Sequence, residues 1–142
     1  MFFQNSYYRF LVLHAAMVCA GFLLALAGIL VARTKPGGKK WLVIHRRLMS
    51  FGVGCFFIGL VLGVSWVQSS WGGHLLFLHA WLALTGFLLM AGNLVLGYRL
   101  FKKAETAKRK RFWHRWIGRT ALVVMAFTIY SGLLRSGFLP FF

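Results

Sequence analysis

Acidic residues are almost absent from this chain: Glu105 is the single one, against 17 lysines and arginines in 142 residues. A proton relay through a membrane usually combines Asp or Glu with His, so the lack of acids argues against that function. The net charge of +16 would suit a nucleic-acid-binding protein. The basic residues, however, occur in blocks between long apolar runs, as topology signals do. We therefore predict a membrane surface as the partner of this charge, and no nucleic acid.

Cysteine is also scarce, and the chain has no CxxC or CxxCH motif. Without CxxCH, a covalently attached c-type haem is excluded, and any haem would be held by side-chain ligation alone. Cys19 and Cys55 both fall within apolar runs. We interpret them as buried small hydrophobic residues.

Apolar residues make up 60% of the chain and form four runs, at about 10–32, 41–67, 75–98 and 112–134. Each can cross a hydrocarbon core of about 30 Å, which needs about 20 helical residues. Helices are expected because lipid cannot satisfy exposed backbone groups. The first run is followed by Arg33 and Lys35, so we interpret it as a retained anchor and not a signal peptide. The prediction is one all-α domain over residues 1–142, an integral membrane four-helix bundle with up-down-up-down topology.

The basic residues also predict an orientation. Six lie in or beside the first connection and nine in or beside the third, whereas the second, around 68–73, has none. Because loops rich in Lys and Arg stay in the cytoplasm, both termini should lie outside. The expected location is the cytoplasmic (inner) membrane.

The two halves of the chain resemble each other. Leu13-His14-Ala15 followed by GFLL recurs as Leu78-His79-Ala80 followed by GFLL, and His45-Arg46 recurs as His114-Arg115. The offsets of 65 and 69 residues suggest that a helical hairpin was duplicated. Chance similarity between leucine-rich helices is the alternative.

Each predicted helix carries one histidine near its start: His14, His45, His79 and His114. Ionisable residues inside a membrane are functional candidates by default. In the predicted topology, His14 and His79 lie near the outer face, and His45 and His114 near the inner face. Helices one and three are diagonal in such a bundle, as are two and four, with axes about 14 Å apart. That span suits two imidazoles and one iron, so we predict two bis-histidine haem sites with irons roughly 20 Å apart.

Steps of seven from each histidine return to nearly the same helix face. They reach small residues almost everywhere, which would leave room for a porphyrin: Gly21, Gly28, Gly52, Gly59, Gly86, Ala121 and Thr128, with Asn93 as the polar exception. The position fourteen residues on should lie beside the opposite haem, about 21 Å along the helix. The alternative is that small residues simply allow close helix packing.

Other sites are less consistent with the pattern. A single zinc site needs converging ligands, but the two pairs lie at opposite ends of the bundle, and no nucleophile with a positioned base is found. His74 could replace His79 as a ligand. Most tryptophans suit the interfacial belt, while Trp81 and Trp116 follow ligand candidates by two residues and could pack around a porphyrin. Haem propionates could be neutralised by Arg46 and Arg115, or by Arg9, Arg135, Lys40 and Arg119.

The segments LHAAMVCAGFLLALAGILVAR, KKWLVIHRRLMSFGVG, LHAWLALTGFLL and RFWHRWIG resemble the cytochrome b561 family of transmembrane electron carriers. They cover the central four helices of that family, which typically has six, and thus nearly all of this chain. The resemblance implies two non-covalent haems b, one held by His14 with His79 and one by His45 with His114. Many members take electrons from cytosolic ascorbate, and Lys39 and Lys40 loosely match lysines that bind it.

The function predicted is transmembrane electron transfer, with ascorbate, quinol or a redox protein as donor and acceptor on opposite faces. Two alternatives remain: a haem-bearing, quinone-linked anchor subunit of a larger redox complex, and a non-catalytic membrane assembly subunit whose histidines bind nothing. A homodimer or larger redox complex would be compatible with any of these.

Overall fold

The computed structural model describes residues 2–35, 38–70, 73, 77–100 and 107–136. They form four long α-helices, α1 (Phe2–Thr34), α2 (Trp41–Ser70), α3 (Leu78–Arg99) and α4 (Ala107–Arg135). A short 3₁₀ turn, η1 (Gly38–Lys40), precedes α2. These ranges contain no β-strand. The predicted all-α class is therefore confirmed.

All four helices are long and apolar enough to span a membrane, over Arg9–Thr34, Trp41–Gln68, Leu78–Arg99 and Lys108–Arg135. Large apolar side chains on every helix point away from the bundle, and Leu23, Phe51, Leu88 and Phe127 are each about 60% exposed. Lipid solvates such side chains, whereas water would not. The exposed surface thus agrees with a membrane-embedded bundle.

The helices extend beyond the apolar runs that predicted them. α1 begins at Phe2 and not near residue 10, and α4 begins at Ala107 and not near residue 112. The added segment of α4 carries Lys108, Arg109, Lys110 and Arg111. Lys and Arg are good helix formers, so a helix continues past the membrane boundary without a change in backbone structure. Hydropathy marks where the lipid core ends, and not where the helix ends.

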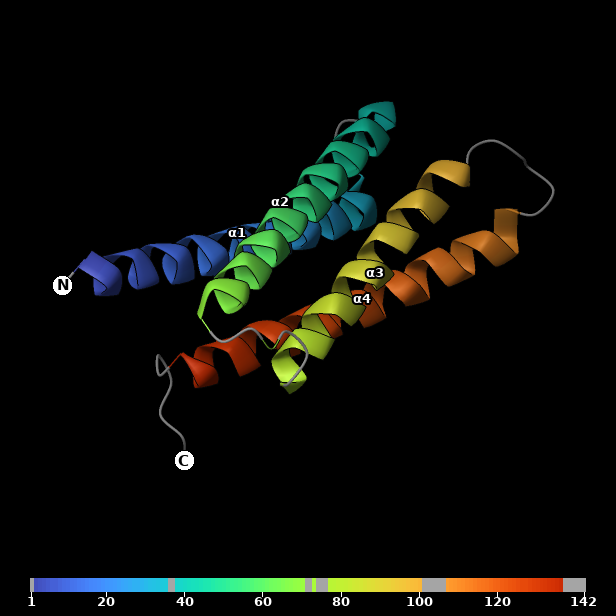
Figure 1. Ribbon diagram of the computed structural model, residues 1–142. Helices are drawn as coiled ribbons and strands as arrows, with labels where there is room; N and C mark the ends of the chain where they lie inside the picture. Colours follow the sequence, from blue (N-terminus) through green and yellow to red (C-terminus); the bar gives the residue numbers. More distant parts are fainter. Residues whose placement is uncertain (1, 36–37, 71–72, 74–76, 101–106, 137–142) are drawn as a thin grey trace.

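The bundle consists of two hairpins lying side by side (Figure 1). α1 packs mainly against α2 and α3 mainly against α4, with smaller contacts between α2 and α3 and between α1 and α4. Within the described ranges, α1 does not pack against α3, nor α2 against α4. The diagonal relation expected from an up-down arrangement is therefore present. The start of α1 and the end of α4 lie toward the same end of the bundle.

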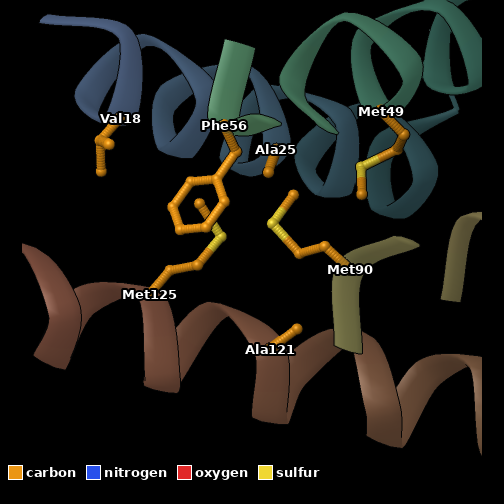
Figure 2. Packing of buried hydrophobic residues seen from close by; sticks show 7 residues of the cluster. All are labelled: Val18, Ala25, Met49, Phe56, Met90, Ala121 and Met125. Carbon is orange, nitrogen blue, oxygen red and sulfur yellow. The ribbon is translucent and has the colours of Figure 1, made fainter. Parts of the chain in front are cut away.

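The two hairpins meet in an apolar core half-way along the bundle (Figure 2). Met90 and Met125 extend from the α3–α4 hairpin toward Phe56 and Ala25 of the α1–α2 hairpin, and all four side chains are at most 3% exposed. Each of these residues lies eleven positions after the histidine of its own helix. This spacing corresponds to about 16 Å of helix. The core therefore lies between the histidines of opposite ends.

Two predicted glycines bring α1 and α2 into close contact. A Cβ atom at Gly21 would lie 2.8 Å from the carbonyl oxygen of Gly52, and one at Gly52 would lie 3.0 Å from the carbonyl oxygen of Gly21. Neither helix could approach so closely with a larger side chain. At these two positions the structure agrees with the close-packing alternative. Cys19 and Cys55 are free thiols that are half-buried, and so less enclosed than expected.

Candidate functional site: two histidine pairs

The four membrane histidines come together in two pairs across the bundle. The ring centroids of His14 on α1 and His79 on α3 are 6.2 Å apart, with an interplanar angle of 74°. Those of His45 on α2 and His114 on α4 are 6.3 Å apart, with an angle of 88°. We call His14 and His79 the outer pair and His45 and His114 the inner pair, after the predicted orientation.

Both separations fit a shared metal ion. Two imidazoles that each bind one metal through a nitrogen at about 2 Å have ring centroids roughly 6 Å apart. Rings in direct van der Waals contact could be closer, and rings that merely line a cavity have no reason to take this spacing twice. Within the described residues, no three His, Cys, Asp or Glu side chains cluster as metal ligands would. The candidate metal ligands thus come in pairs. This suits a metal held by a macrocycle, which leaves two coordination positions for protein side chains.

One ring nitrogen of every histidine is fixed by the neighbouring helix of its hairpin. Nδ1–H of His14 donates to the carbonyl oxygen of Gly59 at 2.7 Å, and that of His45 to Gly28 at 2.8 Å. Nδ1–H of His79 donates to the carbonyl oxygen of Thr128 at 3.0 Å, and that of His114 to Asn93 at 3.2 Å. Because a carbonyl only accepts, the proton resides on Nδ1. Nε2 is then the nitrogen with a free lone pair, as in histidines that ligate a metal.

The accepting carbonyls are those that the sequence spacing indicated. Gly28, Gly59, Asn93 and Thr128 each lie fourteen residues after the histidine of their own helix, and each contacts the histidine of the adjacent helix. Each of these carbonyls therefore lies beside a histidine at the end of the bundle opposite to the histidine of its own helix, and its position beside a haem stays a prediction. The four hydrogen bonds also repeat between hairpins at the offsets of 65 and 69 residues. The structure therefore has the internal symmetry that the repeated motifs suggested.

Three further glycines, which the sevenfold spacing did not identify, adjoin the histidine rings. A Cβ atom would lie 3.0 Å from the His14 ring at Gly63, 2.9 Å from the His79 ring at Gly132, and 3.0 Å from the His114 ring at Gly97. Gly63 and Gly132 are related by the same 69-residue offset as His45 and His114. Extending the repeat to all glycines would have identified Gly63 and Gly132 as equivalent positions, but not Gly97, and not their proximity to the rings.

A family profile described as eukaryotic cytochrome b561 matches residues 13–139. This chain belongs to the cytochrome b561 family. The search of curated proteins and the search of solved structures gave no match. Family membership and the four apolar helices make the chain an integral membrane protein of electron transport that acts with redox partners, and they imply b-type haem as its cofactor.

Two features of the histidine pairs are compatible with that cofactor. The paired rings are spaced for a shared iron, and Nε2 of each ring is left available by the bond at Nδ1. The glycines predicted at steps of seven from the histidines differ in their contacts. Gly28 and Gly59 supply carbonyls to the histidines, whereas a Cβ atom at Gly86 would make ordinary contact with Val124 at 3.5 Å. Their role in accommodating a porphyrin stays a prediction.

The predicted arginines differ in their surroundings. The guanidinium carbon of Arg46 lies 5.4 Å from the ring centre of Tyr98, whose hydroxyl oxygen is 3.1 Å from Oγ of Ser50. This group links α2 with α3 at the inner end. Nε of Arg115 donates to the carbonyl oxygen of Arg111 at 3.3 Å on the exposed side of α4. Arg46 is thus half-buried between α2 and α3, directly after His45, whereas Arg115 is exposed.

At the outer end, the guanidinium carbon of Arg135 lies 3.3 Å from the ring centre of Phe77. Arg9 and Lys40 are exposed, and the guanidinium carbon of Arg119 lies 5.6 Å from the ring centre of Trp116. The sole acidic residue, Glu105, falls outside the described residues, so no carboxylate side chain accompanies these cations within them. Positive charge therefore predominates at both ends of the bundle.

The tryptophans near the histidines differ in exposure. Trp81 and Trp116 are half exposed on the bundle surface, while the ring of Trp41 lies 6.4 Å from that of His45. Trp41 is one of the tryptophans whose position predicts the interfacial belt, and its ring lies beside that of a paired histidine. His74 and the Lys39 side chain lie outside the described residues.

Proposed function

We propose that this chain carries electrons across a membrane through two b-type haems, one held by His14 with His79 and the other by His45 with His114. The observation that supports this most is the repeated ligand geometry. Both pairs have the ring spacing of a shared metal, and all four rings present Nε2 because Nδ1 is bound to a carbonyl. A structural histidine needs the hydrogen bond alone, and would not need a matched partner on the diagonal helix.

The haem, when bound, supplies the one-electron oxidation and reduction. The chain would contribute Nε2 of the four histidines as ligands, and the bonds at Nδ1 hold the rings in one orientation. The Nδ1–H···O=C bond makes Nε2 a stronger donor, as hydrogen bonds behind a metal ligand generally do. Arg46 and Arg115, which directly follow His45 and His114, and Arg135, near His79, would balance propionate charge.

The two sites are separated by the apolar core. The spacing of fourteen residues between a histidine and the carbonyl beside the opposite pair corresponds to about 21 Å along a helix. Ala25, Phe56, Met90 and Met125 fill the interval and are almost completely buried. Haems held by the two pairs would exchange electrons across this interval. The interval between the two pairs is apolar and closely packed.

The proposed orientation puts the inner pair on the cytoplasmic side of the cytoplasmic (inner) membrane, with both termini outside. The basic residues support it, because those of the first and third connections lie beside the starts of α2 and α4. His45 and His114 are near those starts. Ascorbate is the donor that the family favours, and exposed Lys40 lies at the same end as the inner pair.

A quinone-linked role is the second candidate, and a groove of about 420 Å³ favours it. The groove is lined by Leu89 of α3 and by Phe112, Trp113, Trp116, Ile117 and Thr120 of α4. It opens toward lipid on the half of α4 that carries His114, so a quinol dissolved in the bilayer could reach it. Ascorbate would instead approach from water.

Purification with haem content and visible spectroscopy tests the proposal. We expect two haems per chain and the sharp reduced bands of bis-histidine ligation. His14→Ala and His79→Ala should each remove the outer haem and spare the inner one, whereas His45→Ala and His114→Ala should do the reverse. His74→Ala serves as the matched control and should retain both haems.

The donor is tested with the same preparation. Reduction by ascorbate in water without added quinol supports the first candidate, while a requirement for a quinol, lost in Trp116→Ala, supports the second. A folded but colourless protein from haem-replete cells would contradict both and favour an assembly subunit. Loss of both haems from every single histidine variant would leave the pairing unsupported.

A further inference from the structure

The groove between α3 and α4 combines an apolar wall with an aromatic edge. Its volume is about 420 Å³, and on α4 its lining runs from Phe112 to Thr120. The rings of Phe112 and Trp116 are 6.1 Å apart, and both side chains are about half exposed. Eight residues correspond to about 12 Å of helix, and one leaflet of a bilayer is about 15 Å deep in its hydrocarbon part. The groove therefore has the length of most of an acyl chain within one leaflet.

Arg119 lies beside this groove, inside the apolar span. It follows Phe112, where the predicted apolar run begins, by seven residues, or about 10 Å of helix. Side chains on a helix point toward its N-terminus, and the guanidinium carbon of Arg119 accordingly lies 5.6 Å from the ring centre of Trp116. Arg119 thus extends along the groove toward the inner end of the bundle, as long cationic side chains at lipid-facing positions do.

Arg119 also points away from the inner pair. Five residues separate it from His114, which is about 140° around a helix of 3.6 residues per turn. Arg119 is exposed, whereas the ring of His114 faces that of His45 across the bundle. The guanidinium of Arg119 therefore faces lipid, and not the space between the paired rings.

A cation in this position needs a negative partner that the chain does not supply nearby. Charged side chains inside a membrane are costly and are usually paired. The residues one and two turns before Arg119 on its own face, Arg115 and Arg111, are cations as well, and the sole acidic residue, Glu105, precedes Arg119 by fourteen positions. The phosphate of an anionic phospholipid is the negative group that the membrane itself provides.

The internal repeat shows that these features belong to the second hairpin alone. By the offset of 69 residues, Arg119 corresponds to Ser50, whose hydroxyl oxygen is 3.1 Å from that of Tyr98, and Thr120 corresponds to Phe51. The equivalent face of α2 thus has a serine in place of the arginine and a bulky ring in place of the threonine. A general excess of basic residues at the inner end does not account for a difference between two copies of one unit.

We infer that the groove between α3 and α4 binds one anionic phospholipid, with an acyl chain along the groove and the phosphate at Arg119. The apolar lining contacts the chain, and a guanidinium can donate two parallel hydrogen bonds to phosphate oxygens. A neutral quinol would suit the lining but would leave the guanidinium without an anion. The lipid would therefore occupy the groove that the second candidate function assigns to a quinol. The inference requires the membrane-embedded bundle and neither haem.

Native mass spectrometry of the full-length protein in a neutral detergent tests this inference. Delipidated protein is mixed with phosphatidylglycerol, or with phosphatidylcholine that has the same acyl chains. We expect one phosphatidylglycerol to bind per chain, and phosphatidylcholine to bind at least fivefold more weakly. Arg119→Gln should weaken binding of phosphatidylglycerol about fivefold, the effect typical of one basic residue at an anionic surface.

Two further variants serve as control and as second test. Arg47→Gln removes the same charge from an exposed position near the inner end of α2, and it should bind phosphatidylglycerol as the wild type does. Thr120→Phe leaves every charge in place and introduces into the groove the residue of the first hairpin. It should weaken binding of the lipid as well, and it decides the question if Arg119→Gln does not fold.

The possible results separate this inference from the proposed function. Equal binding by Arg119→Gln and Arg47→Gln would show that no single arginine holds the lipid, and would overturn the inference. Equal binding of the two lipids, unchanged binding in Thr120→Phe, or displacement of phosphatidylglycerol by an equimolar quinol would overturn it too. Haem content is measured on the same samples. A protein with two haems that fails these lipid tests leaves the proposed function intact, and a colourless protein that passes them refutes the proposed function alone.

Discussion

Each paired histidine donates Nδ1–H to a carbonyl oxygen of the neighbouring helix. Its ring centroid lies 6.2 or 6.3 Å from that of the histidine on the diagonal helix. The sequence predicted the four residues and the helix positions that would lie beside them, because a spacing of fourteen follows from helix geometry alone. It did not predict Gly63, Gly97 and Gly132. Their proximity to the rings depends on how closely the two helices of a hairpin approach, which spacing along one helix does not contain.

The His79 ring leaves little room for a side chain at Gly132. A Cβ atom there would lie 2.9 Å from Cε1 and 3.3 Å from Nδ1 of the ring. We expect Gly132→Ala to displace the ring from its carbonyl and to reduce outer haem content several-fold, because support behind a metal ligand typically changes affinity by about 10–100-fold. Haem per chain, with helix content from circular dichroism, measures this effect.

Gly92→Ala is the matched control for that substitution. Gly92 lies on α3 of the same hairpin, and a Cβ atom there meets nothing within 4 Å. It should retain both haems. Equal haem content in the Gly132 and Gly92 variants would show that the ring tolerates the added methyl group and that this contact does not matter.

At the scale of elements, the hairpin is the repeated unit, and the repeated motifs in the sequence were sufficient to recognise it. Hydropathy located all four spans but not the true starts of α1 and α4, because the helical backbone continues into polar and basic sequence. The small residues at steps of seven from each histidine could either leave room for a cofactor or allow close contact between helices, and the sequence did not distinguish the two. The structure shows why: Gly21 and Gly52 face each other, while Gly28 and Gly59 face a histidine with their carbonyls.

Close contact at Gly21 is expected to support both sites from one position. In Gly21→Ala, the new Cβ atom would lie 2.8 Å from the carbonyl oxygen of Gly52, which belongs to a backbone and cannot rotate away. Separation of α1 and α2 would stretch the anchors of His14 and His45 together. We expect a loss of about 1–3 kcal/mol in stability and a lower content of both haems, measured by thermal denaturation and absorbance.

Gly54→Ala controls for the loss of a helical glycine in the same hairpin. A Cβ atom at Gly54 meets nothing within 4 Å, so stability should be unchanged or slightly higher, as alanine is the better helix former. If Gly21→Ala were as stable as Gly54→Ala, the hairpin contact would be less tight than the distances indicate.

For the molecule as a whole, the charge distribution predicts the orientation that gives the inner and outer pairs their names. The first and third connections carry most of the 17 basic residues, and loops of this kind stay in the cytoplasm. A reporter active only outside the membrane, fused to the C-terminus, should be active, and one fused within the third connection should be inactive. The opposite pattern would invert the assignment of the pairs while leaving their geometry unchanged.

How the two hairpins meet could not be read from the sequence. The interdigitation of Met90 and Met125 with Phe56 involves residues on three helices, and nothing in the spacing of any one helix specifies which of them face each other (Figure 2). The proximity of Met49 to Gly28 and of Asn93 to Gly118 was likewise hidden, although Asn93 was recognisable as the polar exception among small residues.

The division of ligands between hairpins has a consequence for biogenesis. Every anchoring bond joins helices of one hairpin, whereas both histidine pairs join one hairpin to the other. In the proposed haem sites, each half of the chain would supply one histidine of each pair, and neither half could complete a site alone. Haem binding would therefore fix the two hairpins relative to each other. Folding of the protein and binding of its cofactor would then be coupled.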